Sequence, residues 1–352
     1  MWSFAHGYVS DTKEGETVAK SRRANAVMFG FDFQVNAAIV LMLENIEDLK
    51  ALRLEGNFED IELELDNGKY ILAQAKAVEK SSVDFTNVRK NLHKSLISLS
   101  EGSQKVDAQK LILITNSPNP LNEEASRSIF WGDAHRDFQS LPESSQELIN
   151  GYLNKMNQPL DTDKFMIQVL PFETDNDTER YKVVRQVVED FIGDLNLNIS
   201  GLGKRLLSIW HNEVFKNGTK KDPAIQLKKK DIVWPLMVIA TEVTHFDDSF
   251  GDVFDSSVYD EIVRQYKELI DSCCERCEFF IKVLCDYNAY QTTKRPSEKC
   301  KDFVMNKWED YLPEFELDGI DEEVQMGLIQ IILYKIVRNR IVIQNIKKGV
   351  QL

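Results

Sequence analysis

Residues 58–78 contain the pattern that most restricts the fold of this chain, because apolar and acidic residues alternate and a turn follows. In FEDIELELD, Ile61, Leu63 and Leu65 fall on one face of a strand, and acidic residues fall on the other. The DNG sequence at 66–68 is typical of a hairpin turn, and KYILAQAKAV is the return strand. The pattern predicts an antiparallel hairpin with one buried face.

Two loop lengths suit this hairpin, and they give Gln74 different partners. A two-residue loop places Ile61 opposite Gln74 and mixes apolar with polar side chains on each face. A three-residue loop ending at Gly68 places Asp60 opposite Gln74 and keeps the faces separate. Because a shift of one residue exchanges the faces, we expect the three-residue loop. The polar face then carries Asp60, Glu62, Glu64, Gln74 and Lys76.

Both helices and strands are predicted before and after the hairpin in the sequence. The patterns predict a helix over 36–49, strands over 51–55 and 110–115, a helix within 81–100, and a further strand over 164–173. Together they indicate an α/β domain over residues 1–176, with a mixed sheet flanked by helices. Helical patterns dominate afterwards, so we expect an all-α domain over 177–352. Its long apolar helices suit partner binding or oligomerisation.

Composition narrows the classes of protein. The chain has 352 residues, 43% of them hydrophobic and 28% charged, which is typical of a globular protein with a substantial core. The net charge of −14 argues against a general nucleic-acid coat protein, whose affinity comes from many basic contacts to phosphate. The longest apolar run, 37–43, is too short to cross a bilayer, and the N-terminus lacks a secretory pattern. We therefore expect a cytoplasmic protein without a membrane partner.

The order of these elements, with Asp60 opposite Gln74 and Lys76, resembles the restriction-endonuclease fold. More narrowly, GFDFQ (30–34), LEGNFEDIEL (54–63), QAK (74–76) and LITNS (113–117) are similar to the endonuclease domain of CD-NTase-associated effectors. The same domain occurs in the nuclease subunit of Lamassu-type and ABC-ATPase three-component defence systems. The length of the chain, without a recognisable nucleotide-sensing domain, favours the Lamassu-type subunit.

The resemblance implies a catalytic site of Asp60, Gln74 and Lys76. Hydrolysis of a phosphodiester needs a hard divalent cation, Mg²⁺ or Mn²⁺, held by few carboxylates. Asp60 and Gln74 are the expected ligands, with the Ala75 carbonyl as another, and Lys76 activates water and stabilises phosphate charge. Because Gln74 is neutral, further groups are expected to help. The candidates are Gln34, Glu55, Glu62 and Glu44.

Other polar residues allow more than one interpretation. Arg89, Lys90, His93 and Lys94 crowd one face of the helix within 81–100, where they can line a DNA groove or simply face solvent. Arg22 and Arg23 present the same choice. All five cysteines lie between 273 and 300, and Cys274 and Cys277 have zinc-like spacing. Without a second matching pair, buried thiols are the better interpretation.

These observations favour a Mg²⁺-dependent DNA endonuclease that acts as effector in a bacterial anti-phage or anti-plasmid system. The resemblance implies an SMC-like ATPase and an accessory subunit as partners, which restrain the nuclease until it is released and self-assembles on double-stranded DNA. The alternative is a non-catalytic assembly subunit on a degenerate nuclease fold, which Gln74 in place of Glu supports. RNA cleavage is a third possibility, since nothing in the site reads a 2′-hydroxyl.

Overall fold

The computed structural model describes residues 12–241 except 174 and 198, and residues 276–352 except 297, 316 and 318, with isolated positions between 262 and 270. Side chains are described from residue 24 onward. The chain divides into two compact units. One unit comprises residues 1–191 and 207–229, and the other comprises 192–206 and 230–352. Segments beyond the expected boundary at 176/177 therefore belong to the first unit.

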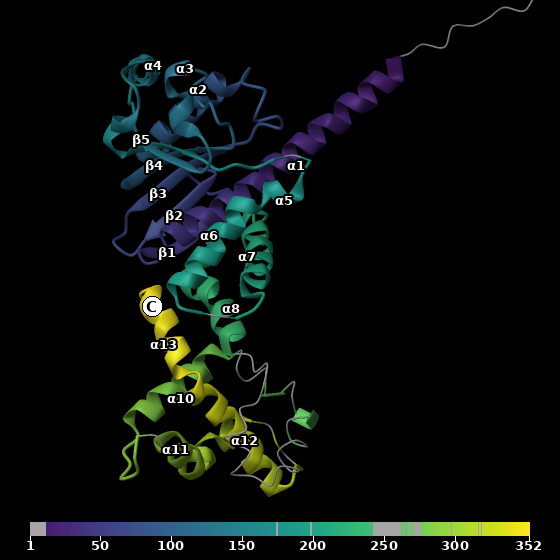
Figure 1. The fold of residues 1–352 in the computed structure, drawn as a ribbon, viewed down its shortest axis with the longest axis vertical. Coiled ribbons are helices and arrows are strands. Elements are labelled where there is room, and N and C mark those ends of the chain that lie inside the picture. Colours follow the sequence, from purple (N-terminus) through teal and green to yellow (C-terminus); the bar gives the residue numbers. More distant parts are fainter. Residues whose placement is uncertain are drawn as a thin grey trace, which may run out of the picture. The chain divides into compact units, whose positions relative to one another are not determined.

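The first unit contains a seven-stranded mixed sheet in the order β5-β6-β4-β3-β2-β1-β7 (Figure 1). Strands β3, β4 and β6 pair in parallel, and the other neighbours are antiparallel. The strands are β1 (Leu49–Leu54), β2 (Ile61–Leu65), β3 (Tyr70–Lys76), β4 (Ala108–Thr115), β5 (Ala134–Asp137), β6 (Phe165–Val169) and β7 (Leu227–Lys228). The predicted mixed sheet flanked by helices is confirmed.

The predicted hairpin register is also confirmed. Ile61 pairs with Ala73 and Glu64 pairs with Tyr70, as the three-residue loop requires. The loop closes through the Leu65 backbone N–H, which donates to the Lys69 carbonyl at 2.9 Å. Gly68 has a φ of 79°, the left-handed conformation that favours glycine. The register separates the two faces as expected, but the prediction of a single buried face is wrong. Glu62, Leu72 and Gln74 on the second face are also buried, because α2 covers it.

Helices pack on both faces of the sheet. Helix α2 (Val88–Ser103) covers β3 and β4, where Leu72, Leu96 and Leu113 belong to one buried cluster. Helix α1 (Thr12–Glu44) contacts β1, β2 and β3, whose remaining apolar residues are also buried. The other helices of this unit are α3 (Glu124–Arg127), α4 (Glu143–Leu153), α5 (Asp177–Arg180), most of α6 (Lys182–Asp194) and most of α7 (Leu202–Gly218). Short 3₁₀ turns are η1 (Ser128–Phe130), η2 (Phe138–Ser140) and η3 (Thr162–Lys164).

Helix α1 differs from its prediction. It begins at residue 12 rather than 36 and ends at 44, and its first turns extend away from the rest of the unit in Figure 1. By length and composition alone, residues 24–44 can cross a membrane, although no segment was expected to qualify. Most of this stretch is buried in the protein, as for a core helix. The side chains of Arg22 and Arg23 lie outside the described residues.

The second unit is helical, as predicted for the C-terminal region. Its helices are α8 (Lys229–Thr241), α10 (Cys277–Ala289), α11 (Lys299–Lys307), α12 (Glu322–Arg338) and α13 (Arg340–Gly349), with the 3₁₀ segment η5 (Trp308–Glu314). The expected last helix is two helices that meet at Asn339. Cys273, Cys274 and the Cys277 side chain lie outside the described residues. Cys285 is a free, exposed thiol, which corrects the expectation of burial, and Cys300 is free and half-buried.

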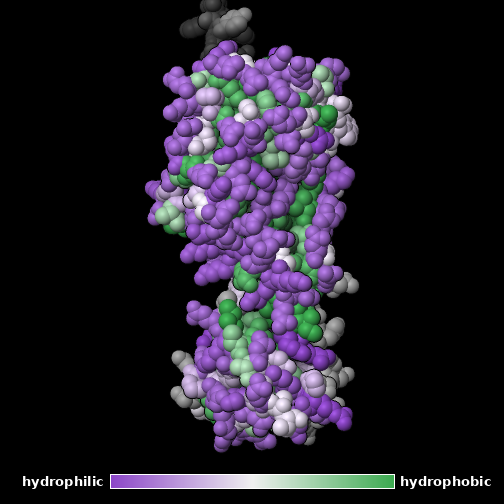
Figure 2. Space-filling model, turned by 90° about the vertical axis from the view of Figure 1, so that its left-hand side faces the viewer, coloured by the Kyte–Doolittle hydropathy of each residue, from purple (hydrophilic) through white to green (hydrophobic). Residues whose placement is uncertain are grey.

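Figure 2 shows one face of the molecule, on which hydrophilic residues predominate in the sheet-containing unit. Hydrophobic residues also reach the surface there and in the helical unit.

Candidate active site

Asp60, Gln74 and Lys76 meet at one end of the β2–β3 hairpin. The Gln74 side-chain amide donates to Asp60 Oδ2, and Lys76 Nζ lies 3.5 Å from the same oxygen. The backbone N–H of Ala75 also donates to Asp60 Oδ2, at 3.0 Å. Strand β2 begins only at Ile61, so the Asp60 carboxylate satisfies an edge N–H of β3 that has no partner strand on that side.

The two oxygens of Asp60 have different surroundings. Oδ2 collects all three donors, and no donor from the described residues contacts Oδ1. The side chain of Asp60 is 20% exposed and that of Lys76 is 27% exposed, whereas Gln74 is buried. The site therefore presents a partly exposed carboxylate oxygen and an ammonium group at the sheet end.

Glu55 and Gln34 lie beside this group. The Gln34 side chain, on α1, lies beside the Glu55 carboxylate at the end of β1 and favours its charged form. Desolvation and the neighbouring Asp60 carboxylate raise the pKa of Glu55. Glu55 adopts a φ of 54°, which a residue with a Cβ rarely adopts and which commonly marks functional sites. Its backbone N–H donates to the Asp60 carbonyl at 2.8 Å, so the same turn positions both carboxylates.

Glu62 does not join the site. Its carboxylate accepts hydrogen bonds from the backbone N–H groups of Phe58 and Glu59, which fixes the loop between β1 and β2. Gly56 closes the same loop, and a Cβ at this position would collide with the Glu62 carboxylate. Desolvation by burial raises the pKa of Glu62. Glu62 therefore shapes the loop that delivers Asp60.

Glu59 is a buried acid that the alternating pattern did not single out. It is 6% exposed, and neither carboxylate oxygen accepts a well-formed hydrogen bond, although the Ser98 hydroxyl lies beside it. Burial, together with the Asp60 charge, raises its pKa to about 7. Glu59 packs near Gly102 of α2. Its proximity to Asp60 in sequence was the only available signal.

Residues at the end of β4 hold the backbone at the end of β3 in place. The Thr115 hydroxyl donates to the Lys76 carbonyl at 2.6 Å, and Asn116 exchanges hydrogen bonds with both backbone groups of Val78. The Asn116 side chain also donates to the Phe172 carbonyl at 2.9 Å. These contacts give a structural role to the LITNS segment, which holds the backbone that carries Lys76.

Glu44 belongs to a different polar cluster. Its carboxylate accepts from the buried Gln168 amide at 3.1 Å and lies 3.6 Å from His135 Nε2, which is also 3.4 Å from Asp133. Burial raises the pKa of Glu44, and the neighbouring Asp133, with Glu44, raises that of His135. Glu44, Gln168 and the Asp133–His135 pair are distant from one another in sequence, so no local spacing predicted the cluster.

The residues proposed for DNA binding on α2 separate into two kinds. Arg89 donates from Nε to the Leu121 carbonyl at 3.0 Å and is held by the turn that follows β4. His93 stacks on Tyr152, with ring centroids 4.7 Å apart. Lys90 and Lys94 are exposed, and within the described part of the chain neither forms an ion pair. Of the three basic residues, Lys90 and Lys94 therefore have the freer side chains, whereas Arg89, although 47% exposed, is bound to backbone carbonyls.

Within the residues that the structure describes, no three His, Cys, Asp or Glu side chains are grouped closely enough to hold a metal ion. A cation at Asp60 would therefore depend on amide or carbonyl oxygens as well. Comparisons with protein-family models, with curated proteins and with solved structures found no match.

Proposed function

We propose that this protein is a Mg²⁺- or Mn²⁺-dependent DNA endonuclease with a restriction-endonuclease-like sheet domain, the effector of a bacterial anti-phage or anti-plasmid defence complex. The observation that carries the proposal is the meeting of Asp60, Gln74 and Lys76, with Lys76 Nζ 3.5 Å from Asp60 Oδ2. This is the arrangement that the resemblance implies, and it occurs at a partly exposed end of the hairpin. Glu55 and Gln34 extend it from two further elements.

The donor set suits a hard cation. Asp60 Oδ1 has no donor among the described residues, and the Glu55 carboxylate lies near the Asp60 charge. The Gln74 amide currently presents nitrogen to Asp60, and a half-turn of the amide presents its oxygen instead. Asp60, Gln74 and the Ala75 carbonyl would hold the cation, with Glu55 in support. A bound Mg²⁺ would supply Lewis acidity and an acidified water.

The remaining roles belong to the protein itself. The Ala75 N–H holds the Asp60 carboxylate in place, which leaves Oδ1 directed away from that bond. Lys76 supplies a compact positive charge for the phosphate and a proton donor or acceptor for the attacking water. Lys90 and Lys94 supply exposed positive charge for the DNA backbone.

The partners are proposed from the resemblance. An SMC-like ATPase and an accessory subunit would dock on the helical unit and restrain the nuclease. Release and self-assembly would then bring two sites to the two strands of a duplex. The net charge of −14 supports a need for such partners, because the isolated chain is expected to bind DNA weakly.

A second candidate, a non-catalytic assembly subunit, is favoured by the donors around Asp60. Three donors on Oδ2 satisfy this carboxylate as a structural group that caps the edge of β3, and Gln74 adds no charge. In this interpretation the site has lost its cation, and the sheet domain serves only assembly.

Cleavage of plasmid DNA by the full complex, with Mg²⁺ and with EDTA, separates the two candidates. Lys76→Ala should lower the cleavage rate by at least about 10²-fold, because a charge aimed at the transition state is lost. Lys69→Ala is the matched control, since it removes an exposed lysine from the start of the same strand region and should change the rate by less than about twofold. EDTA-resistant cleavage, or full activity of Lys76→Ala, would contradict the proposed nuclease site.

A further inference from the structure

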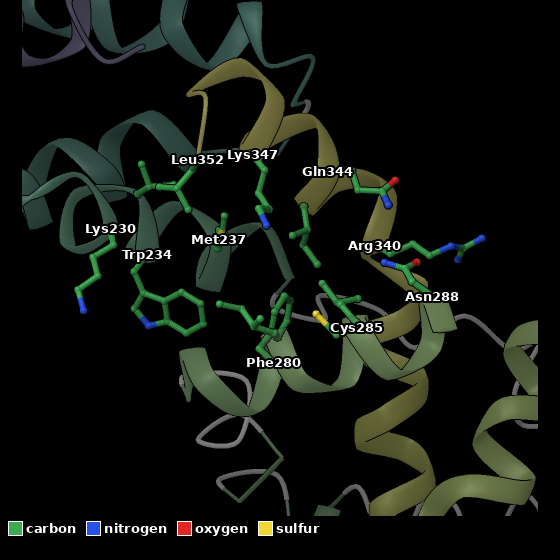
Figure 3. A pocket seen from close by; sticks show the side chains of 14 residues that line it. Lys230, Trp234, Met237, Phe280, Cys285, Asn288, Arg340, Gln344, Lys347 and Leu352 are labelled. Atoms are coloured by element: carbon green, nitrogen blue, oxygen red, sulfur yellow. The ribbon is translucent and has the colours of Figure 1, made fainter. Parts of the chain in front are cut away.

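Helices α8, α10 and α13 of the second unit enclose a groove with a cavity of about 180 Å³. Its walls are mostly apolar, and Figure 3 shows Trp234, Met237 and Phe280 pointing toward one another between α8 and α10. The rings of Trp234 and Phe280 meet edge to face, with centroids 6.0 Å apart. We call this feature, with its lining residues, the helical-unit groove.

The size of the helical-unit groove favours side chains over a whole small molecule. Sites for drug-sized ligands span roughly 300–1,000 Å³. A cavity of about 150 Å³ lined by apolar residues accepts one benzene-sized group. The groove therefore accommodates one or two large apolar side chains of a segment that lies along it, which is how helices anchor in hydrophobic grooves. Ile281 and Leu352 line it with 46% and 45% of their surface exposed, which extends apolar contact beyond the cavity.

The charges at the helical-unit groove have one sign. Lys230, Arg340 and Lys347 line it, and no acidic side chain among the described residues does so, although acidic residues outnumber basic ones 57 to 43 in the chain. Lys347 points toward the apolar space in Figure 3, whereas Arg340 points away. Arg340 also lies over the Tyr287 ring at 5.3 Å, which fixes its position. An occupant with apolar residues flanked by carboxylates would match both features.

We propose that the helical-unit groove binds an acidic amphipathic helix of a partner protein. Apolar residues at i, i+3, i+4 and i+7 of that helix would enter between α8 and α10, and its Asp or Glu side chains would face Lys230 and Lys347. This inference does not depend on nuclease activity, because it uses only residues of the second unit. It assigns a binding surface and a chemical class of partner to the helical unit.

Selection from a phage-displayed library of random 16-residue peptides on the full-length protein tests this proposal. Selected peptides should carry apolar residues at helical spacing and a net negative charge. Their affinity, measured by fluorescence anisotropy, should fall at least about tenfold in Lys347→Glu, where a favourable charge becomes repulsive. Lys348→Glu makes the same charge change on the same helix outside the lining residues, and should change affinity by less than about twofold.

Cys285→Phe provides a second test that does not alter charge. Cys285 is exposed and lines the groove, so a phenyl group can fill the cavity without displacing the buried core, and peptide binding should be lost while thermal unfolding is unchanged. The proposal is overturned if no peptide prefers the wild type over these two groove variants, or if basic peptides are selected. It is also overturned if sedimentation shows a dimer that Lys347→Glu dissociates, because a second copy would then be the occupant.

Discussion

Asp60 and Asp32 are two carboxylates in the same unit, each 20% exposed, that differ in how their oxygens are used. Asp32 uses both: Oδ1 contacts Asn36 and His211 at 3.0 Å. Asp60 concentrates its donors on Oδ2 and keeps Oδ1 without a donor from the described residues. The two carboxylates are equally exposed, but the described residues donate to both oxygens of Asp32 and to only one oxygen of Asp60. Asp32 therefore holds the fold, and Asp60 has an oxygen that can bind a ligand.

The remaining contacts of Asp32 support this distinction. Its Oδ2 accepts from the Tyr181 hydroxyl at 2.9 Å and lies 3.6 Å from Arg180. Arg180 in turn lies over the rings of Phe29 and Phe172, at 5.6 and 5.7 Å from their centroids. Asp32 thus connects α1 with the segments that follow the sheet. Desolvation raises the pKa of Tyr181 further above neutral pH, and its hydroxyl donates to Asp32.

The largest expected effects come from changing each aspartate to asparagine. Asp60→Asn should lower DNA cleavage by at least about 10³-fold, because the ligand charge is lost, and should lower the free energy of unfolding by about 1 kcal/mol. Asp32→Asn should change cleavage only a few-fold and lower the free energy of unfolding by about 1–3 kcal/mol, because the replacement leaves its donors imperfectly paired. Plasmid cleavage by the complex and urea denaturation measure the two quantities. Equal loss of cleavage activity in Asp60→Asn and Asp32→Asn would contradict the different roles assigned to the two carboxylates.

The next largest expected effect is a pH dependence of the free energy of unfolding that arises from Glu59. Its pKa is raised to about 7 in the folded protein, so between pH 4.5 and 7 the unfolded chain binds fewer protons than the folded one. The stabilisation is fully present below pH 4.5 and is lost as the pH rises through 7. Glu59→Gln should remove this dependence and raise the free energy of unfolding at pH 8 by up to about 3 kcal/mol. Urea denaturation of both proteins at pH 5 and pH 8 measures the difference, and parallel pH profiles would contradict it.

The smallest effects concern α2. Lys90→Ala and Lys94→Ala should each reduce the slope of log affinity against log salt for DNA binding by about one, because each exposed lysine neutralises about one phosphate. Arg89→Ala should leave that slope unchanged and lower the free energy of unfolding by about 1 kcal/mol, because Arg89 binds the carbonyls of Leu121 and Asn122. Filter binding by the complex at several salt concentrations provides the slopes. If only Arg89→Ala reduced the slope, Arg89 would be the phosphate contact and the two lysines would not.

The parts of the fold that depend on local patterns could be predicted. The alternation before Gly68 and the turn sequence determined the register, which places Asp60 beside Gln74 and Lys76. Strands β5 and β7 could not be predicted, because four and two residues carry no usable periodicity and form only against β6 and β1. Their existence depends on the sheet that they join.

The candidate site could be predicted only where it follows the strands. Glu62 lies on the expected face but turns onto the loop backbone, because unsatisfied N–H groups of Phe58 and Glu59 need an acceptor. Glu44, at the end of α1, instead meets Gln168 of β6, 124 residues away. Loop conformation and long-range packing determine these contacts, and neither has a local sequence pattern.

Binding of Mn²⁺ to the full-length protein, followed by electron paramagnetic resonance, tests the central claim most directly, because it requires neither DNA nor release from partners. The wild type and Asp32→Asn should bind one ion with dissociation constants within about twofold of each other. Asp60→Asn should bind at least about tenfold more weakly, since it removes the carboxylate ligand. Equal affinity of Asp60→Asn and the wild type would contradict the claim that the Asp60 carboxylate is a cation ligand.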